Sequence, residues 1–211
     1  MNPIDPLRTA IVAVHFVNDI VGPGGTFAPL FQKEIQQNNI VGNTVRLLDS
    51  ARAAGAEIVY TRVAYRAGYT DLVANSPLLG MVVQQKCLLD GTAGAEFIEE
   101  VAPQSGDVVV THQRVSGFHG TELDVLLRAA GIDTVVLAGV ATNVSVESTA
   151  RSASDRGYRT IVVSDACASD SPDAHKASLS SLELLAEVAT TDDVISGFLP
   201  QQHQEKAYAR D

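Results

Sequence analysis

The sequence has few cysteines, few positive charges and no long uninterrupted apolar run. Its two cysteines, Cys87 and Cys167, lie far apart and outside any C-x-x-C spacing, which argues against a disulfide framework and a zinc site. We expect both to be small buried hydrophobic residues. The 15 Lys and Arg are outnumbered by 25 Asp and Glu, for a net charge of -10. Such a chain lacks the clustered cations that bind nucleic acid or an anionic membrane, so we expect a small-molecule partner instead.

The lack of a long apolar run also bears on location. No stretch of about 18 apolar residues occurs, and the N-terminal segment MNPIDPLRTAIVAVHF has no basic region followed by an apolar one. We therefore expect a cytoplasmic protein. Hydrophobic residues make up 45% of the chain and charged residues 19%, a balance that favours a single globular domain over residues 1–211.

What the sequence does contain is an alternation of two patterns. Runs rich in β-branched residues predict buried parallel strands at 9–14, 57–63, 107–112, 134–140, 160–165 and 187–191. Apolar residues at helical spacing predict helices around 41–51, 123–130, 146–153 and 179–185. This alternation predicts an α/β fold with a doubly wound, mostly parallel sheet and right-handed crossovers.

Residues 64–106 interrupt the alternation. The segment contains RAGYTD, NSPLLG and DGTAGAE, and it is too long for a plain loop, so we expect an irregular insertion that covers the ends of the strands. Its stretch LVANSPLLGMVV holds more apolar residues than a solvated loop normally carries. Such a segment favours self-association.

Three polar side chains stand where ligands bind in sheets of this kind. Ligands sit beyond the carboxyl ends of the parallel strands. His15 follows the first predicted strand, His112 ends the third, and Ser145 lies just inside the helix that follows the fourth. The fold would bring these residues, which are distant in the sequence, to one edge of the sheet.

Longer stretches around these residues resemble the isochorismatase-like hydrolases, also called the cysteine hydrolase superfamily. The similar segments are TAIVAVHFVNDIVGPGG at the start, the central block from VVVTHQRVSGFHG to RTIVVSDACAS, and SPDAHKASLSSL after it. The resemblance implies a small-molecule hydrolase with a six-stranded, mostly parallel sheet flanked by helices, in a Rossmann-like three-layer sandwich. It also implies a homo-oligomer, a dimer or a tetramer.

The chain departs from that family at its reactive positions. The resemblance places a catalytic Asp, Lys and Cys where this sequence has His15, His112 and Ser145. Some relatives also hold zinc through an Asp and two His beside the pocket, and this chain has no matching Asp-x-His motif. We therefore expect neither a metal nor another cofactor.

The substituted triad leaves more than one hypothesis. In the first, Ser145 is the nucleophile, His15 its base and His112 a cationic or hydrogen-bonding partner, with an amide, an ester or a vinyl ether as substrate. If Ser145 is not a nucleophile, His15 would act as a general acid without a covalent intermediate. In the second hypothesis, the chain binds a ligand or assembles without catalysis. A Ser and His pair usually needs a third group to orient the ring, and Asp19 and Asp165 are candidates by position alone.

The same resemblance adds backbone groups and binding residues. It implies a cis peptide bond between Val140 and Ala141, with the amides of Ala141 and Ser145 facing the pocket as an oxyanion site. Arg114 could meet a substrate carboxylate, and Phe118 matches a pocket-side aromatic residue of the family.

Other polar residues near these motifs have structural interpretations. We expect Thr142 to cap the helix that carries the serine. His119 is expected in an exposed loop, and His175 in a structural hydrogen bond on a later helix.

Overall fold

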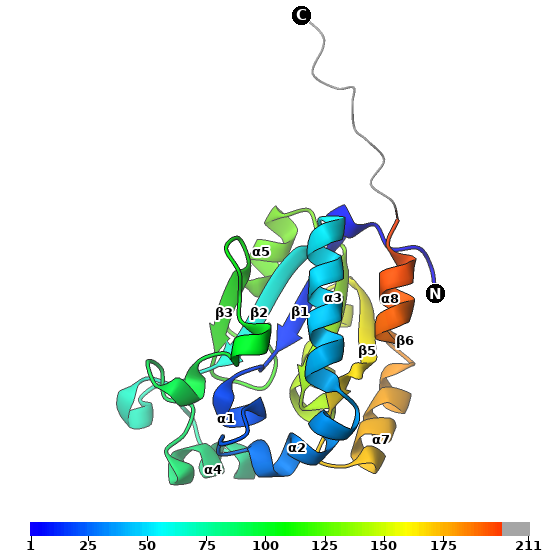
Figure 1. Cartoon of the computed structure of the whole chain (residues 1–211). Coiled ribbons are helices and arrows are strands. Elements are labelled where there is room, and N and C mark those ends of the chain that lie inside the picture. The colour runs from blue at the N-terminus through cyan, green and yellow to red at the C-terminus, as the bar shows by residue number, and fades with distance from the viewer. Residues whose placement is uncertain (200–211) are drawn as a thin grey trace, which may run out of the picture.

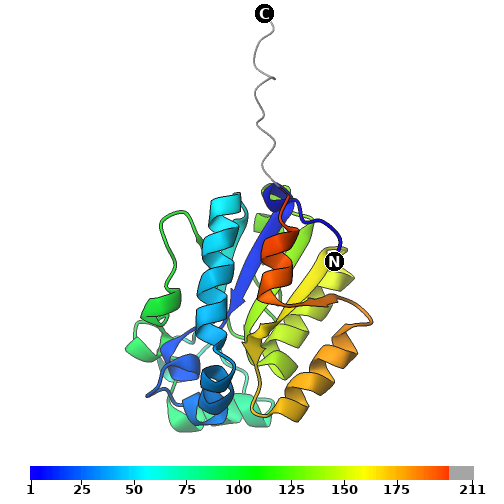
Figure 2. The same ribbon diagram turned by 45° about the vertical axis from the view of Figure 1, so that its right-hand side comes forward.

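A six-stranded sheet runs through the protein, with the strand order β3-β2-β1-β4-β5-β6 and parallel pairing throughout. The structure is a computed structural model, and it describes residues 1–199. Helices cover both faces of the sheet, as Figures 1 and 2 show. β1 and β4 are adjacent at its centre, where the strand order reverses. Their carboxyl ends therefore meet at the position that binds ligands in doubly wound folds.

The strands follow the apolar runs closely. They are β1 (Thr9–Val14), β2 (Glu57–Val63), β3 (Val108–His112), β4 (Thr134–Val140), β5 (Arg159–Ala168) and β6 (Glu187–Ala189). β1, β2 and β4 have the predicted bounds, because their side chains are buried on both faces. β5 extends past the predicted end at 165, and its pairing with β4 shifts register between Leu137 and Gly139. The predicted parallel sheet is confirmed.

The helices agree with the periodic patterns less completely. They are α1 (Asn18–Val21), α2 (Ala28–Gln37), α3 (Ile40–Ala54), α4 (Pro77–Gln85), α5 (Leu123–Ala129), α6 (Glu147–Asp155), α7 (Pro172–Leu182) and α8 (Thr191–Gly197). α7 begins earlier than the 179–185 pattern predicted, because the Ser171 side chain accepts a hydrogen bond from the Ala174 amide and Pro172 occupies the first turn. The sequence analysis did not predict α1, α2, α4 or α8.

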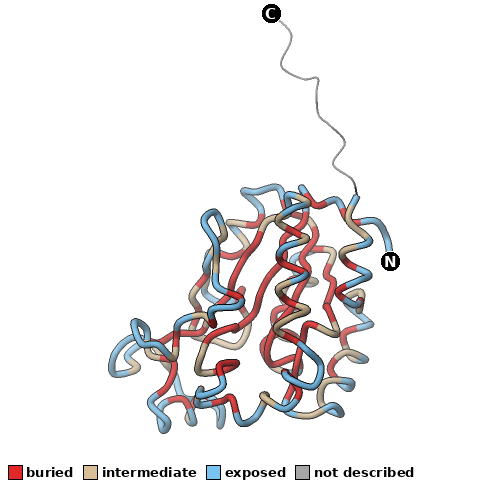
Figure 3. The backbone as a smooth tube through the Cα atoms, in the orientation of Figure 1, coloured by how far each residue is buried: buried red, intermediate tan, exposed pale blue. Residues whose placement is uncertain are grey.

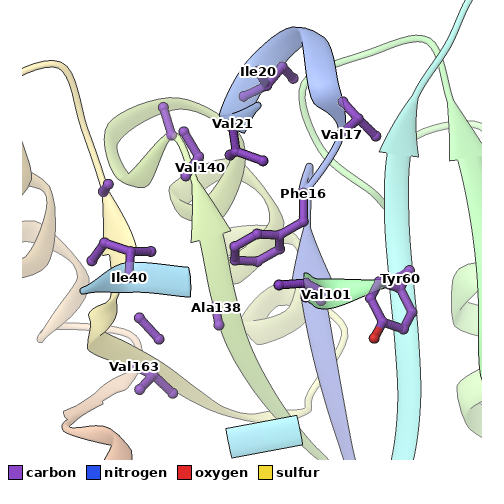
Figure 4. Close-up of a cluster of buried hydrophobic side chains, with 14 of the residues drawn as sticks. Phe16, Val17, Ile20, Val21, Ile40, Tyr60, Val101, Ala138, Val140 and Val163 are labelled. Atoms are coloured by element: carbon purple, nitrogen blue, oxygen red, sulfur yellow. The ribbon is translucent and has the colours of Figure 1, made fainter. Parts of the chain in front are cut away.

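The hydrophobic core has one half on each side of the sheet. In β1, Ile11 and Ala13 pack into the cluster under α3 and α8, whereas Val12 and Val14 pack into the cluster under α5, α6 and α7. Figure 4 shows part of the first cluster, including Phe16. In Figure 3 the strands at the middle of the protein are coloured mostly as buried. Successive side chains of a strand point to opposite faces, so burial on both sides explains the continuous apolar runs.

The insertion at 64–106 packs against α1 beyond the strand ends, as expected. The Leu88 amide donates to Asp19 Oδ2 at 2.7 Å, and Asn18 Nδ2 donates to the Ala93 carbonyl at 3.0 Å. α1, α2 and α4 lie together below the carboxyl ends of the strands in Figure 1. Within residues 1–199, none of the helices combines the length and the apolar character needed to cross a membrane.

Candidate active site

A cavity of about 90 Å³ lies at the carboxyl ends of β1 and β4. His15, Ala141 and Ser145 line it from the sheet side, and α1, α2, α4 and the insertion supply the remaining walls. His112 is fully buried and does not line the cavity, but it contacts His15. The structure thus brings His15, His112 and Ser145 together at the carboxyl edge of the sheet, where the strand positions had predicted them.

The backbone at His15 has a conformation that few residues adopt. Its φ is 64°, in the left-handed region, and its amide donates to the Thr61 carbonyl at 2.9 Å. Outside glycine, Asn, Asp and His are the residues enriched there. The family's Asp and this chain's His therefore both suit the turn that follows β1.

The two histidine rings form a buried pair. His15 Nε2 lies 3.0 Å from His112 Nε2, and the ring centroids are 4.9 Å apart with an interplanar angle of 24°. His112 Nδ1 lies 2.6 Å from the Arg114 carbonyl oxygen. A carbonyl only accepts, so His112 Nδ1 carries the hydrogen, and neutral His112 presents its Nε2 lone pair to His15. When both rings are neutral, one hydrogen lies between the two Nε2 atoms, and the Val140 backbone also hydrogen-bonds the His15 ring.

Burial keeps both rings neutral. It lowers the pKa of His112 from 6.5 to about 4. The pKa of His15 also lies well below its usual value, first through burial and then through the nearby His112, although hydrogen bonding to the Val140 backbone favours the charged ring. The cationic role considered for His112 does not agree with this environment. Its Nε2 instead lies against the neutral His15 ring.

Ser145 lies in a single π-helical turn, Thr142–Val146, that precedes α6. The residue is only 6% exposed. Within residues 1–199, its hydroxyl forms no hydrogen bond, so the direct bond to a histidine that a resting Ser-His pair would show is not formed. Thr142 does not cap the helix as predicted, because its Oγ1 pairs with His175 Nδ1 at 2.9 Å.

The backbone beside the serine has the expected geometry in part. The Val140–Ala141 peptide bond is cis, as predicted. The Ala141 carbonyl accepts from the Val146 amide at 3.1 Å, whereas the Ala141 amide donates to no partner among the described residues. Ala141 and Ser145 both line the cavity.

Of the two predicted substrate-binding residues, only one lines the cavity. Arg114 does, and its guanidinium donates to the Val73 carbonyl at 3.1 Å and to Asn75 Oδ1 at 3.0 Å. Phe118 is 4% exposed and packs in the core cluster on the other side of the sheet, beside Tyr158. Its predicted pocket-side position is not found, because the loop after β3 turns its ring toward α5.

The acids proposed as third members of the site have other partners. Asp19 holds α1 to the insertion through Leu88, and Asp165 Oδ1 accepts from the Thr191 amide and hydroxyl at 2.7 and 2.9 Å. Sequence reasoning missed the contact between His15 and His112, since only the ring orientations reveal that pair.

The remaining expectations for single residues are confirmed. His175 forms the structural hydrogen bond already described, and His119 is exposed. Cys87 and Cys167 are both buried and unpaired. In the part of the chain that the structure describes, no cluster of three or more His, Cys, Asp or Glu side chains could hold a metal ion.

Comparison with known proteins adds a family to this geometry. The isochorismatase domain model matches residues 9–193. The chain is 33% identical over 193 residues to the maleamate amidohydrolase of Pseudomonas putida, covering 89% of this chain and 85% of that protein. It is 32% identical over 206 residues to a ureidoacrylate amidohydrolase of Caulobacter vibrioides, covering 90% of this chain and 91% of that protein.

Solved structures show the same likeness. A cysteine hydrolase from Pseudomonas syringae superposes with a TM-score of 0.84 and 34% identity, covering 93% of this chain and 95% of that one. An N-carbamoylsarcosine amidase from Thermoplasma acidophilum superposes with a TM-score of 0.70 and 33% identity, covering 88% and 97%. The likeness spans the sheet and the helices on both of its faces.

Proposed function

Since the chain belongs to the isochorismatase family, we propose that it is a hydrolase of small amides or esters, with Ser145 as nucleophile and His15 as base. The observation that carries the proposal is the shared cavity: the serine hydroxyl and the oriented histidine ring both lie on its wall. The names of the curated relatives, which are amidohydrolases, support an amide as the first choice.

His15 suits the base role because burial keeps its ring neutral. A neutral imidazole has one unprotonated nitrogen, which can take the proton of a serine hydroxyl. The hydroxyl has no partner in the resting structure and can rotate when a substrate binds, since catalytic hydrogen bonds often tighten only in the complex. His112 is a positioning residue that acts through His15.

The reaction then runs in two steps. Ser145 Oγ attacks the carbonyl carbon and gives its proton to His15, and the amides of Ala141 and Ser145 stabilise the negative oxygen. The intermediate collapses to an acyl-serine, and His15 passes the proton to the departing amine or alcohol. Water, deprotonated by the same ring, hydrolyses the acyl-serine, which releases a carboxylic acid and restores the hydroxyl.

The electrostatics support this role over general-acid catalysis on a vinyl ether. A general acid must be protonated at the working pH. Burial keeps the pKa of His112 at about 4 and that of His15 well below 6.5, so neither ring carries a spare proton near neutral pH. A neutral pair favours proton abstraction.

Replacement of Ser145 tests the proposal. Ser145→Ala should lower kcat on the best amide or ester by about 1,000-fold or more, because the covalent step is lost. Ser145→Cys should keep measurable activity, since a thiol is also a nucleophile. Mass spectrometry of the quenched wild-type enzyme should find the acyl group on Ser145. Ser154→Ala, on the same helix system but away from the cavity, is the matched control.

An active enzyme whose Ser145→Ala variant keeps its full rate would eliminate the nucleophile. A purified protein that turns over no amide, ester or vinyl ether would favour the other hypothesis, a ligand-binding or assembly protein on the same fold.

A further inference from the structure

The walls of the cavity are unusually free of polar groups. Apart from His15, Tyr65, Arg114 and Ser145, every lining side chain is aliphatic or aromatic. α2 and the residue before it contribute Phe27, Leu30 and Phe31, and α4 contributes Leu78, Leu79 and Val82. Within residues 1–199, no carboxylate, lysine or side-chain amide reaches the lining.

Three of the four polar side chains at the cavity have protein partners, whereas the Ser145 hydroxyl has none within residues 1–199. The Tyr65 hydroxyl donates to the Gln113 carbonyl at 3.1 Å, which uses its one hydrogen. The Arg114 guanidinium donates to the Val73 carbonyl and to Asn75 Oδ1 at the rim. His15 Nε2 is engaged with His112. The Arg114 guanidinium keeps further N–H groups, but the wall that α2 and α4 form offers no side-chain donor that could receive a carboxylate.

The surroundings also oppose charge. Burial raises the pKa of Tyr65 to about 12, so its hydroxyl stays neutral. An ionised substrate group placed against the apolar side chains of α2 and α4 would lose its water without gaining a matched partner, whereas an apolar group would gain from leaving water.

We propose that the substrate is an uncharged carbonyl compound with a small apolar acyl group, branched aliphatic or aromatic, seated between α2 and α4. The inference rests on the proposed function only in placing the carbonyl carbon beside Ser145. The apolar residues of the two helices select the acyl group, and the carbonyl is the polar end that faces the serine and the Ala141 amide.

A matched pair of amides tests the preference. 4-Methylpentanamide and succinamate have the same chain and differ only in an isopropyl group that replaces a carboxylate of similar shape. We expect kcat/KM to favour 4-methylpentanamide by about 100-fold or more, because a buried carboxylate without a partner is rejected strongly. Equal rates, or faster hydrolysis of succinamate, would overturn the inference. Such a result would indicate that Arg114 binds a substrate carboxylate.

A binding measurement separates this inference from the proposed chemistry. The full-length Ser145→Ala variant is titrated with 4-methylpentan-1-ol and with 4-hydroxybutanoate, again an isopropyl and carboxylate pair, and binding is followed by ligand-observed NMR. Binding of the neutral alcohol alone supports the apolar cavity even if no amide is hydrolysed. Stronger or equal binding of the carboxylate, or binding of neither, overturns it.

A variant of the wall completes the test. Leu30 lines the cavity but is 48% exposed, so Leu30→Gln should leave the fold intact while it adds a polar group. The preference for the neutral member of each pair should fall by about 10-fold, mainly through KM or Kd. Leu184→Gln, at a residue 85% exposed and away from the cavity, is the control and should change nothing. An unchanged preference in Leu30→Gln would contradict the assignment of the wall.

Discussion

At the scale of single residues, the site depends on two buried imidazoles. An ordinary exposed histidine titrates near neutral pH, whereas burial lowers the pKa of both of these rings. His15 and His112 are 4% and 0% exposed, and their Nε2 atoms lie 3.0 Å apart. A hydrogen on each nitrogen would clash, so the pair is stable only with one hydrogen between the rings. The Arg114 carbonyl holds a hydrogen on His112 Nδ1, so His15 supplies the hydrogen between the rings when both are neutral.

The pair should make stability depend on pH. The pKa of each folded ring is lowered, so unfolded histidine binds a proton near 6.5 while the folded pair does not. The contribution of the neutral pair to the free energy of unfolding is fully present above about pH 6.5 and is lost as the pH falls toward 4. The loss from His112 is about 3 kcal/mol. Urea unfolding at pH 7, 6, 5 and 4.5 should show the decline. The His15→Asn, His112→Gln double variant should have a flatter profile, whereas His119→Asn, at an exposed loop residue, should not.

The orienting role of His112 predicts a distinct pattern of activity. His112→Gln can still accept from His15, so it should retain more activity than His112→Leu, which should lose about 10- to 100-fold in kcat with little change in KM. In the wild-type enzyme, kcat/KM should be level between about pH 6 and 8 and should fall only in acid, because the lowered pKa of His15 replaces the value near 6.5 expected from sequence. A wild-type rate that rises steeply through pH 6.5, or equal activity in both variants, would contradict this assignment.

At the scale of elements, the close packing of β1 against β4 positions the site. Gly139 pairs with Val14, its φ is 144°, and a Cβ on it would lie 2.2 Å from the Val14 carbonyl oxygen. Only glycine can occupy this place without moving the strands apart. The turn that follows carries Ala141 and Ser145, so the same contact fixes the distance between the serine and His15.

Gly139→Ala should therefore destabilise the protein by about 3 kcal/mol or more, because it combines a disfavoured φ with a backbone overlap. Gly131→Ala is a matched control: its φ is 72°, but a Cβ there would meet nothing within 4 Å. It should cost only about 1 kcal/mol. Chemical unfolding of both variants measures the difference, and equal costs would show that the contact between the strands can relax.

At the scale of the whole molecule, α4 leaves apolar side chains in solvent. Leu78, Met81 and Val83 are 39%, 40% and 39% exposed, and Val73 nearby is 67% exposed. Exposed apolar side chains gathered on one element are typical of an interface. They agree with the predicted self-association of the insertion, which stays a prediction for this single chain.

We expect a homo-oligomer in solution. Light scattering at micromolar concentration should give a multiple of 22.3 kDa, and Met81→Lys should shift the equilibrium toward the monomer because it places a charge in the interface. Leu184→Lys, on a different part of the surface, serves as the control. A wild-type species of 22.3 kDa would contradict the prediction.

The sequence by itself determined the sheet and the positions of His15, His112 and Ser145 at its edge. A strand buried on both faces is mostly apolar, so the bounds of β1, β2 and β4 could be predicted correctly from the sequence. The resemblance added the cis Val140–Ala141 bond. These features depend on neighbours along the chain or on the repeating geometry of a strand.

Only the tertiary structure decided how the site works. The His15–His112 bond depends on side-chain torsions and on a carbonyl contributed by Arg114, and no spacing in the sequence encodes it. Phe118 could not be placed for a similar reason, since a loop residue has no periodicity that marks its face. The apolar cavity is assembled from α1, α2, α4, the ends of β1, β2 and β4, and the loop after β3, and its helices were not predicted from the sequence. In the sequence, each apolar wall residue is an ordinary hydrophobic residue. The proposed selectivity of the cavity for an apolar acyl group arises only because folding places these residues together beside Ser145.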